Sequence, residues 1–175
     1  MTTKTYNVLF LCTGNSARSI LAESILRKDG APHFNAFSAG NMPKGEVHPM
    51  ALKVLGDAGY PTHGFRSKSW EEFAAPGAAQ MDFIFTVCDN AAGEVCPVWP
   101  GQPMSAHWGI EDPAAVTSSP MEQEAAFVAA LRYMKNRIGA FTALPLASLD
   151  RLTLGAKLGE IGASQGASKK RPDVA

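Results

Sequence analysis

One stretch of the sequence has residue types and spacing suited to nucleophilic attack on an anion. Apolar residues 8–11 end at Cys12, and five small or polar residues separate this cysteine from Arg18 and Ser19. A strand, a tight loop and a helix N-terminus in that order surround an anion with free backbone N–H groups. The helix dipole favours a thiolate at the start of the loop, and an arginine fork can hold two oxygens of a tetrahedral oxyanion.

The segment therefore predicts a nucleophilic cysteine at the edge of an oxyanion-binding loop. The residues expected to bind the oxyanion are Thr13, Gly14, Asn15, Ser16, Ala17 and Arg18. Gly14 and Asn15 are residue types that tolerate the positive φ needed to turn backbone amides inward.

Simple burial as a small apolar residue is the alternative for Cys12. Cys88 and Cys96 have no arginine at the same offset, so only Cys12 carries the pattern. Other phosphate loops do not fit, because the chain has no GxxxxGK[ST] motif and no GxGxxG after this strand.

The elements that must position this loop alternate between strand and helix. The sequence predicts strands over residues 5–11, 34–38, 81–87 and 104–107. It predicts helices over 18–28, from His48-Pro49, from Ser69, as a short turn over 91–95, over 120–143 and over 146–161. This alternation is typical of an open parallel α/β sheet, whose ligands bind at the carboxyl ends of the strands.

Cys12 and Cys88 both follow a predicted central strand. Neighbouring strands lie about 4.8 Å apart, and a disulfide joins Cα atoms roughly 4.4–6.8 Å apart. The two cysteines can therefore meet after modest movement if their strands are neighbours. His48 precedes a proline at a helix start and is predicted to cap that helix rather than act as a base.

Composition indicates one domain with a substantial core, since the chain has 175 residues. Its 16 basic and 16 acidic residues cancel, which argues against a nucleic-acid or membrane surface. No apolar run reaches membrane-spanning length, and the first one is too short for a signal peptide. We expect a cytoplasmic protein whose three cysteines are reduced and serve catalysis or redox chemistry.

Two parts of the sequence resemble a known family. Residues 12–19, CTGNSARS, resemble the active-site loop of the low-molecular-weight protein tyrosine phosphatase superfamily. Residues 85–97 and 106–113 resemble the arsenate reductases of the thiol-relay type built on that fold. The resemblance covers about residues 5–143 and implies a three-layer, four-stranded open parallel sheet flanked by helices.

The resemblance divides the chain into three parts. Residues 1–145 are expected to form the phosphatase-like arsenate reductase domain, and residues 146–161 an additional C-terminal helix. Residues 162–175 are small, polar and basic, and are expected to form a disordered tail.

The resemblance implies a first step in which the Cys12 thiolate attacks arsenate while Arg18 and the loop amides balance charge. Ser19 would hydrogen-bond the thiolate, and Asp112 would protonate the departing oxygen. A simple turn is the alternative for Asp112-Pro113.

The resemblance also implies a relay of disulfides. Cys88 attacks Cys12 and releases arsenite, and Cys96 then attacks Cys88. No bound cofactor is needed, but thioredoxin, or glutaredoxin with glutathione, must reduce the final disulfide. Phosphate and sulfate are expected to compete with arsenate. The alternatives for the pair are structural burial or half a zinc site with His107, although the spacing of the cysteines does not favour zinc.

Two positions depart from some relatives of this type. Ala17 stands where some carry another cysteine, so the relay does not require that thiol. Lys68 lies near a place where some carry an acidic ligand for potassium, so neither a potassium ion nor another metal is expected.

Three functions remain open at this point. The first is arsenate reduction for detoxification. The second is hydrolysis of phosphomonoesters through a Cys12 phosphoenzyme, which ignores Cys88 and Cys96. The third is a non-catalytic oxyanion-binding module, which needs neither Asp112 nor the cysteine pair. The sequence favours the first, because only redox turnover uses three cysteines in these positions.

Overall fold

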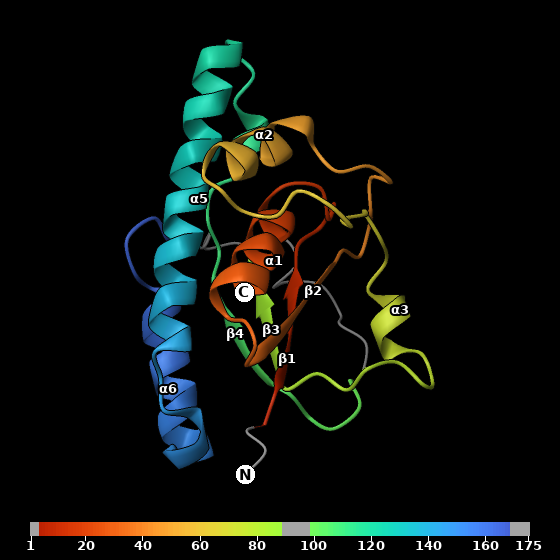
Figure 1. Ribbon diagram of the computed structural model, residues 1–175, viewed down its shortest axis with the longest axis vertical. Coiled ribbons are helices and arrows are strands. Elements are labelled where there is room, and N and C mark those ends of the chain that lie inside the picture. The colour runs from red at the N-terminus through yellow and green to blue at the C-terminus, as the bar shows by residue number, and fades with distance from the viewer. Residues whose placement is uncertain (1–3, 89–98, 169–175) are drawn as a thin grey trace, which may run out of the picture.

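The computed structural model describes residues 4–88 and 99–168. In this part of the chain, four parallel strands form one sheet in the order β2-β1-β3-β4 (Figure 1). The strands are β1 (Tyr6–Leu11), β2 (Phe34–Ala39), β3 (Phe83–Thr86) and β4 (Met104–His107). The helices are α1 (Arg18–Asp29), α2 (Pro49–Asp57), α3 (Glu71–Ala74), α5 (Pro120–Thr142) and α6 (Arg151–Gly162). Two 3₁₀ turns, η1 (Pro113–Ala115) and η2 (Leu146–Ser148), complete the described elements.

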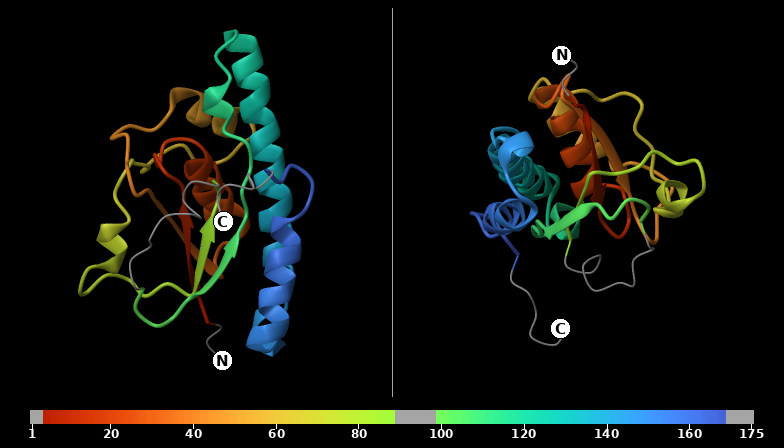
Figure 2. Two further views of the ribbon diagram at one scale, coloured as in Figure 1. Left: turned by 180° about the vertical axis from the view of Figure 1, so that it is seen from behind. Right: turned by 90° about the horizontal axis from the view of Figure 1, so that it is seen from below.

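Strand β1 is the centre of a three-layer structure. Val8 and Phe10 lie in a core shared with α1, α2, α5 and α6, whereas Leu9 and Leu11 lie in a smaller core on the other face of the sheet. Figure 2 shows α5 and α6 on one side of the sheet and α3 on the other. All four of these β1 side chains are buried. This confirms the predicted parallel α/β sheet. Successive side chains of a strand point to opposite faces, and both faces of β1 are covered, so nearly every residue of this strand must be apolar.

The strand register brings the carboxyl ends of β1 and β3 together. Leu11 pairs with Ala39 of β2 and with Thr86 of β3, and Thr86 pairs in turn with His107 of β4. Because all four strands run in the same direction, the segments that follow them emerge at one edge. The residues that directly follow β1, β3 and β4 therefore lie close together.

Capping side chains explain several helix boundaries. His48 Nδ1 accepts a hydrogen bond from the Met50 amide at 3.1 Å, with Pro49 as the first residue of α2. This confirms the predicted capping role of His48. Asp150 accepts a hydrogen bond from the Thr153 amide at 2.8 Å and starts α6.

The structure differs from the predicted elements in three places. The helix expected from Ser69 is short and ends at Ala74, because the residue before Pro76 is extended. The helix expected over 146–161 divides into η2 and α6, because Asp150 caps a new helix there. Residues 162–168 were expected to be disordered, whereas Gly162 ends α6 and residues 163–168 pack on the loop after β4.

The short turn predicted over 91–95 lies outside the described residues. Over residues 4–88 and 99–168, the helices are too short or too polar to span a lipid bilayer.

Candidate active site

The loop between β1 and α1 comprises residues 12–17, and we call it the Cys12 loop. Several of its carbonyl groups point outward. The carbonyl oxygens of Thr13, Gly14 and Ser16 accept hydrogen bonds of 2.9–3.0 Å from backbone amides in residues 42–48. In a planar trans peptide, the N–H points opposite to the preceding C=O. The amides that follow these three residues therefore point into the loop, as an oxyanion site requires.

Asn15 carries the backbone strain of the loop. Its φ is +44°, whereas Gly14, the other residue expected to tolerate positive φ, does not have one. The Asn15 side-chain amide donates to the hydroxyls of Ser19 at 2.8 Å and Ser38 at 2.9 Å, and its oxygen accepts from the Lys68 backbone amide at 3.0 Å. These bonds stabilise a conformation that would otherwise cost about 1–3 kcal/mol.

Gly40, at the end of β2, fits against the Cys12 loop and was not singled out by the sequence. A methyl group on Gly40 would lie 2.4 Å from the Thr13 carbonyl oxygen and 2.7 Å from that of Cys12. Both atoms are backbone atoms and cannot move aside cheaply. The only clue in the sequence is a glycine at the predicted end of a strand.

The Cys12 side chain is 5% exposed. A hydrogen bond with the Cys88 side chain, followed by burial and the charge on Cys88, raises the pKa of the Cys12 thiol well above its usual range. The Arg18 charge and the Asn15 backbone amide act in the opposite direction and lower it. The sequence predicts a thiolate, but it could not include this coupling with a second thiol. The two sulfurs titrate as a pair, in which ionisation of one opposes ionisation of the other.

Cys88 reaches the mouth of the loop from the end of β3. Its Sγ accepts a hydrogen bond from the Thr13 amide at 3.3 Å and lies 3.4 Å from the Thr13 hydroxyl. The structure thus brings together two cysteines that the sequence placed at the ends of central strands, because β1 and β3 are neighbours. Cys96 lies outside the described residues.

Arg18 connects the Cys12 loop to residues 108–113 after β4, which we call the Asp112 loop. Its Nη1 donates to the Ile110 carbonyl oxygen at 2.9 Å, and its Nη2 lies 3.8 Å from Asp112 Oδ2. Arg18 Nε is buried and has no hydrogen-bond partner among the described residues. A buried, unpaired guanidinium donor beside inward-pointing amides fits an oxyanion ligand.

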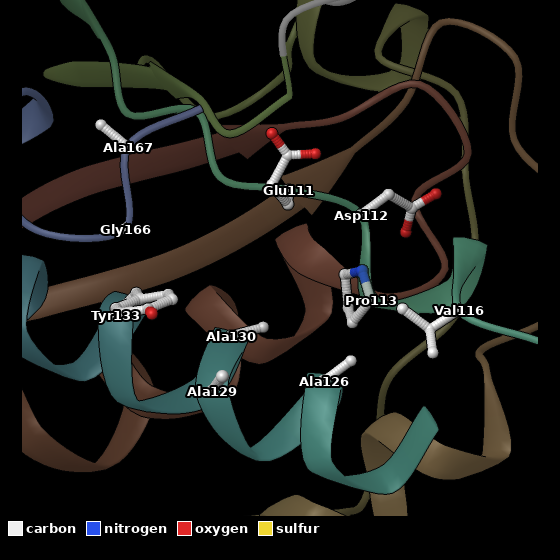
Figure 3. Close-up of a pocket in the computed structure, with 10 residues that line it drawn as sticks. All are labelled: Glu111, Asp112, Pro113, Val116, Ala126, Ala129, Ala130, Tyr133, Gly166 and Ala167. Atoms are coloured by element: carbon white, nitrogen blue, oxygen red, sulfur yellow. The ribbon is translucent and has the colours of Figure 1, made fainter. Parts of the chain in front are cut away.

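Asp112 both forms a turn and faces the site. Its Oδ1 accepts from the Ala114 amide at 3.0 Å and caps η1, and its side chain remains 38% exposed. Behind it, the Asp112 loop, α5 and residues 166–167 border a cavity of about 370 Å³. Figure 3 shows Asp112 at one end of this cavity and Gly166 and Ala167 at the other.

Lys68 lies in a polar cluster behind the loop. Its ammonium group is 3.5 Å from Asn15 Oδ1, 3.4 Å from Ser38 Oγ and 3.8 Å from Glu23 Oε1. Burial lowers the pKa of Lys68, and the Glu23 charge partly opposes that effect. A lysine cation thus lies among the oxygens that support Asn15.

Ser19 is fully buried, and its hydroxyl accepts the hydrogen bond from Asn15 already described. Its contribution in the structure is to position Asn15, and a hydrogen bond from Ser19 to the thiolate stays a prediction.

The alternative zinc set of Cys88, Cys96 and His107 includes a residue outside the described ranges. His107 Nδ1 shares a hydrogen bond of 2.8 Å with the Thr86 hydroxyl. Within residues 4–88 and 99–168, no three side chains of His, Cys, Asp or Glu converge as metal ligands would.

Comparison with known proteins places this geometry in context. Residues 7–151 match the family of low molecular weight phosphotyrosine protein phosphatases. The chain is 34% identical over 121 residues to an arsenate reductase of Bacillus licheniformis, covering 69% of this chain and 83% of the relative. It superposes on a solved arsenate reductase in the oxidized state with a TM-score of 0.65 and 25% identity, covering 79% of this chain and 98% of the other. A thioredoxin-dependent arsenate reductase of Corynebacterium glutamicum shares the fold, with a TM-score of 0.53 and 23% identity over 79% of this chain and 64% of that one.

Proposed function

Because the chain belongs to the low molecular weight phosphotyrosine protein phosphatase family, we propose that it uses this family's loop to reduce arsenate to arsenite. The observation that carries the proposal is the position of Cys88, whose sulfur lies 3.3 Å from the Thr13 amide at the mouth of the Cys12 loop. A phosphate-ester hydrolase needs no second thiol there. A reductase does, because its covalent intermediate must be attacked by another sulfur.

In the first step, the Cys12 sulfur attacks arsenic and forms an S–As bond. One oxygen of arsenate leaves as water, with a proton supplied by Asp112 in its protonated form. The inward-pointing amides and the guanidinium of Arg18 balance the charge of the oxyanion. Arg18 also favours the thiolate, since its charge lowers the pKa of Cys12.

In the second step, the Cys88 sulfur attacks Cys12 Sγ. The S–S bond forms as the S–As bond breaks, and the bonding electron pair passes to arsenic, which is reduced from As(V) to As(III). The product leaves as arsenite. The two sulfurs supply the two electrons, and their hydrogen-bonded arrangement keeps the attacking sulfur next to its target.

In the third step, Cys96 attacks the Cys88 sulfur, forms a Cys88–Cys96 disulfide and frees Cys12. An external dithiol protein such as thioredoxin then reduces this disulfide, and glutaredoxin with glutathione is the other candidate. A relay that must return to three thiols suits a reducing compartment, so we place the protein in the cytoplasm. Phosphate and sulfate, as tetrahedral oxyanions, compete for the loop.

Phosphomonoester hydrolysis is the second candidate. Arg18 and Asp112 are 3.8 Å apart beside the loop, an arrangement that also suits protonation of an aryl leaving group. Such an activity would use Cys12, Arg18 and Asp112 and would be independent of Cys88 and Cys96.

The test is arsenate-dependent NADPH consumption with thioredoxin and thioredoxin reductase, compared with glutathione and glutaredoxin. Cys12→Ser should abolish reduction and any hydrolysis of an aryl phosphate. Cys88→Ser and Cys96→Ser should each stop multiple turnover and leave that hydrolysis intact. Normal multiple turnover by Cys96→Ser would refute the relay, and a wild-type protein that hydrolyses aryl phosphates but ignores arsenate would favour the second candidate.

A further inference from the structure

The chain after Arg151 lies beyond the part that matches the family, yet it packs on the segment that leads to Asp112. The Leu158 carbonyl oxygen in α6 accepts a hydrogen bond of 3.0 Å from the fully buried Trp108 indole. Gly162, the last residue of α6, lies so close that a methyl group there would be 2.2 Å from the His107 carbonyl oxygen. Helix α6 is therefore in direct contact with the end of β4.

Residues 163–168, which we call the C-terminal strap, continue this contact along the Asp112 loop. The Ser168 amide donates to the Gly109 carbonyl oxygen at 3.0 Å, and Ala167 pairs with Ile110 as in an antiparallel sheet. On its other side, the same loop is bound to the end of β3, where the Ile110 amide donates to the Val87 carbonyl oxygen at 3.2 Å. The loop is thus held between β3 and the strap.

A buried arginine of α5 fixes the strap in turn. The guanidinium of Arg137 donates to carbonyl oxygens of Gly162, Ser164 and Gln165 at 3.2–3.4 Å. Arg137 is almost completely buried, so these carbonyls replace the water that a charged group would otherwise need. The strap is consequently attached to the body of the protein and is not a loose end.

Ile110 links this assembly to the candidate active site. Its carbonyl oxygen accepts the 2.9 Å hydrogen bond from Arg18 Nη1. The neighbouring residues 111–113 and Val116 border the cavity of about 370 Å³ beside α5, with Gly166 and Ala167 at its other end (Figure 3). The cavity leaves this side of the Asp112 loop without packed side chains. The backbone hydrogen bonds that Gly109 and Ile110 make to the strap and to Val87 therefore matter more for the position of the loop.

From these contacts we infer that α6 and the C-terminal strap form a brace that positions the Asp112 loop and, through Ile110, the guanidinium of Arg18. The brace touches no reacting atom. Its part in the reaction rests on the proposed function, which gives Asp112 and Arg18 their roles. Its part in oxyanion binding does not depend on redox chemistry.

Two glycines of α6 provide a matched test. In Gly162→Ala, the new methyl would meet the backbone at His107 and the Trp108 ring at 2.8 Å, and would displace α6 from the loop. In Gly159→Ala, the same methyl on the same helix has nothing within 4 Å. Both variants make the same substitution in the same helix, so a loss confined to Gly162→Ala reports the contact with the end of β4.

We would titrate inorganic phosphate by calorimetry and measure amide hydrogen exchange over residues 109–113 in both full-length variants. For Gly162→Ala we expect the phosphate Kd to rise about tenfold, which is the loss expected when a charged contact is misplaced by a fraction of an ångström. Exchange over the loop should also become faster. Gly159→Ala should match the wild type. Identical results for the two variants would refute the inference that the brace positions the Asp112 loop.

Arsenate turnover adds an independent readout. If the wild type reduces arsenate, Gly162→Ala should lower kcat/KM about 10- to 100-fold relative to Gly159→Ala. If the wild type does not reduce arsenate, the proposed function fails, whereas phosphate binding and hydrogen exchange still decide whether the brace exists.

A second pair of variants applies if Gly162→Ala does not fold. Ser168→Pro removes the amide that donates to Gly109, and Ser168→Ala retains it. Faster loop exchange and weaker phosphate binding in Ser168→Pro, but not in Ser168→Ala, would support the brace. Equal behaviour of these two variants would refute it.

Discussion

Replacing Gly40 with alanine gives the sharpest test of how the Cys12 loop is held. The added methyl would lie 2.4 Å from the Thr13 carbonyl oxygen, 2.7 Å from that of Cys12 and 3.0 Å from the Asn15 amide nitrogen. A close C···O contact is about 3.3 Å, so the shortest distance falls short by roughly 0.9 Å. All three neighbours are loop backbone atoms, and β2 is fixed by its pairing with β1. The loop must therefore move by a large part of that distance.

A displacement of this size has consequences for both stability and binding. Overpacking of a well-packed site costs about 1–3 kcal/mol. A shift approaching 1 Å in the groups that hold a reacting ion costs on the order of 100-fold in rate. We therefore expect Gly40→Ala to lower kcat/KM for arsenate about 100-fold and to weaken phosphate binding, while the protein remains folded.

The assay combines steady-state kinetics, phosphate calorimetry and urea denaturation, with Gly139→Ala in α5 as the matched control. A methyl on Gly139 has nothing within 4 Å, so this variant should keep wild-type activity and gain up to about 1 kcal/mol of stability. If Gly40→Ala retained wild-type kcat/KM and phosphate affinity, the loop would not be positioned by its contact with β2.

Three further predictions concern single groups of the site. Arg18→Lys should lower kcat/KM about 100- to 1,000-fold in the NADPH-coupled assay. A single ammonium nitrogen cannot replace the separate Nη1 and Nη2 that face Ile110 and Asp112, nor the planar fork that holds two oxygens of an oxyanion. A loss below threefold would contradict this. Cys88→Ala should lower the pKa of Cys12, because the hydrogen bond and charge of Cys88 raise it. The shift is measured from the pH dependence of Cys12 alkylation by iodoacetamide in a Cys96→Ser background. An unchanged or raised pKa would exclude the coupling. Burial and the Lys44 charge lower the pKa of His48 below 6.5. The unfolded chain therefore binds a proton more readily than the native protein, and the free energy of unfolding should fall as the pH drops below 6.5 towards the folded-state pKa. Urea midpoints measured at pH 7.5 and 5.5 should decrease less for His48→Asn, which keeps a capping side chain, than for the wild type.

Local chemistry made much of the site predictable from the sequence. A cysteine, a short polar loop, an arginine and a helix follow each other along the chain, so Cys12 and Arg18 needed no long-range information. The apolar strands and their shared direction placed Cys12 and Cys88 at the same edge of the sheet, and only the strand order of the structure shows that β1 and β3 are neighbours. His48 was predictable as a cap because its role depends only on Pro49 and the helix that follows.

Other features depend on contacts between distant parts of the chain. The need for glycine at position 40 arises from backbone atoms nearly 30 residues earlier. The raised pKa of Cys12 follows from the distance between two thiols, which strand order alone does not give. Arg137 reads as one more polar residue of a long helix, and only the fold reveals that it binds the carbonyls of the C-terminal strap.

The central claim is that oxidation passes from Cys12 to Cys88 and then to Cys96, and a single turnover tests it directly. One equivalent of arsenate would be added to fully reduced protein, remaining thiols would be alkylated under acid quench, and the disulfides would be mapped by mass spectrometry. The account predicts a Cys88–Cys96 disulfide with Cys12 alkylated in the wild type, and a Cys12–Cys88 disulfide in Cys96→Ser. Release of arsenite from Cys96→Ser with Cys88 still alkylated as a thiol would contradict it.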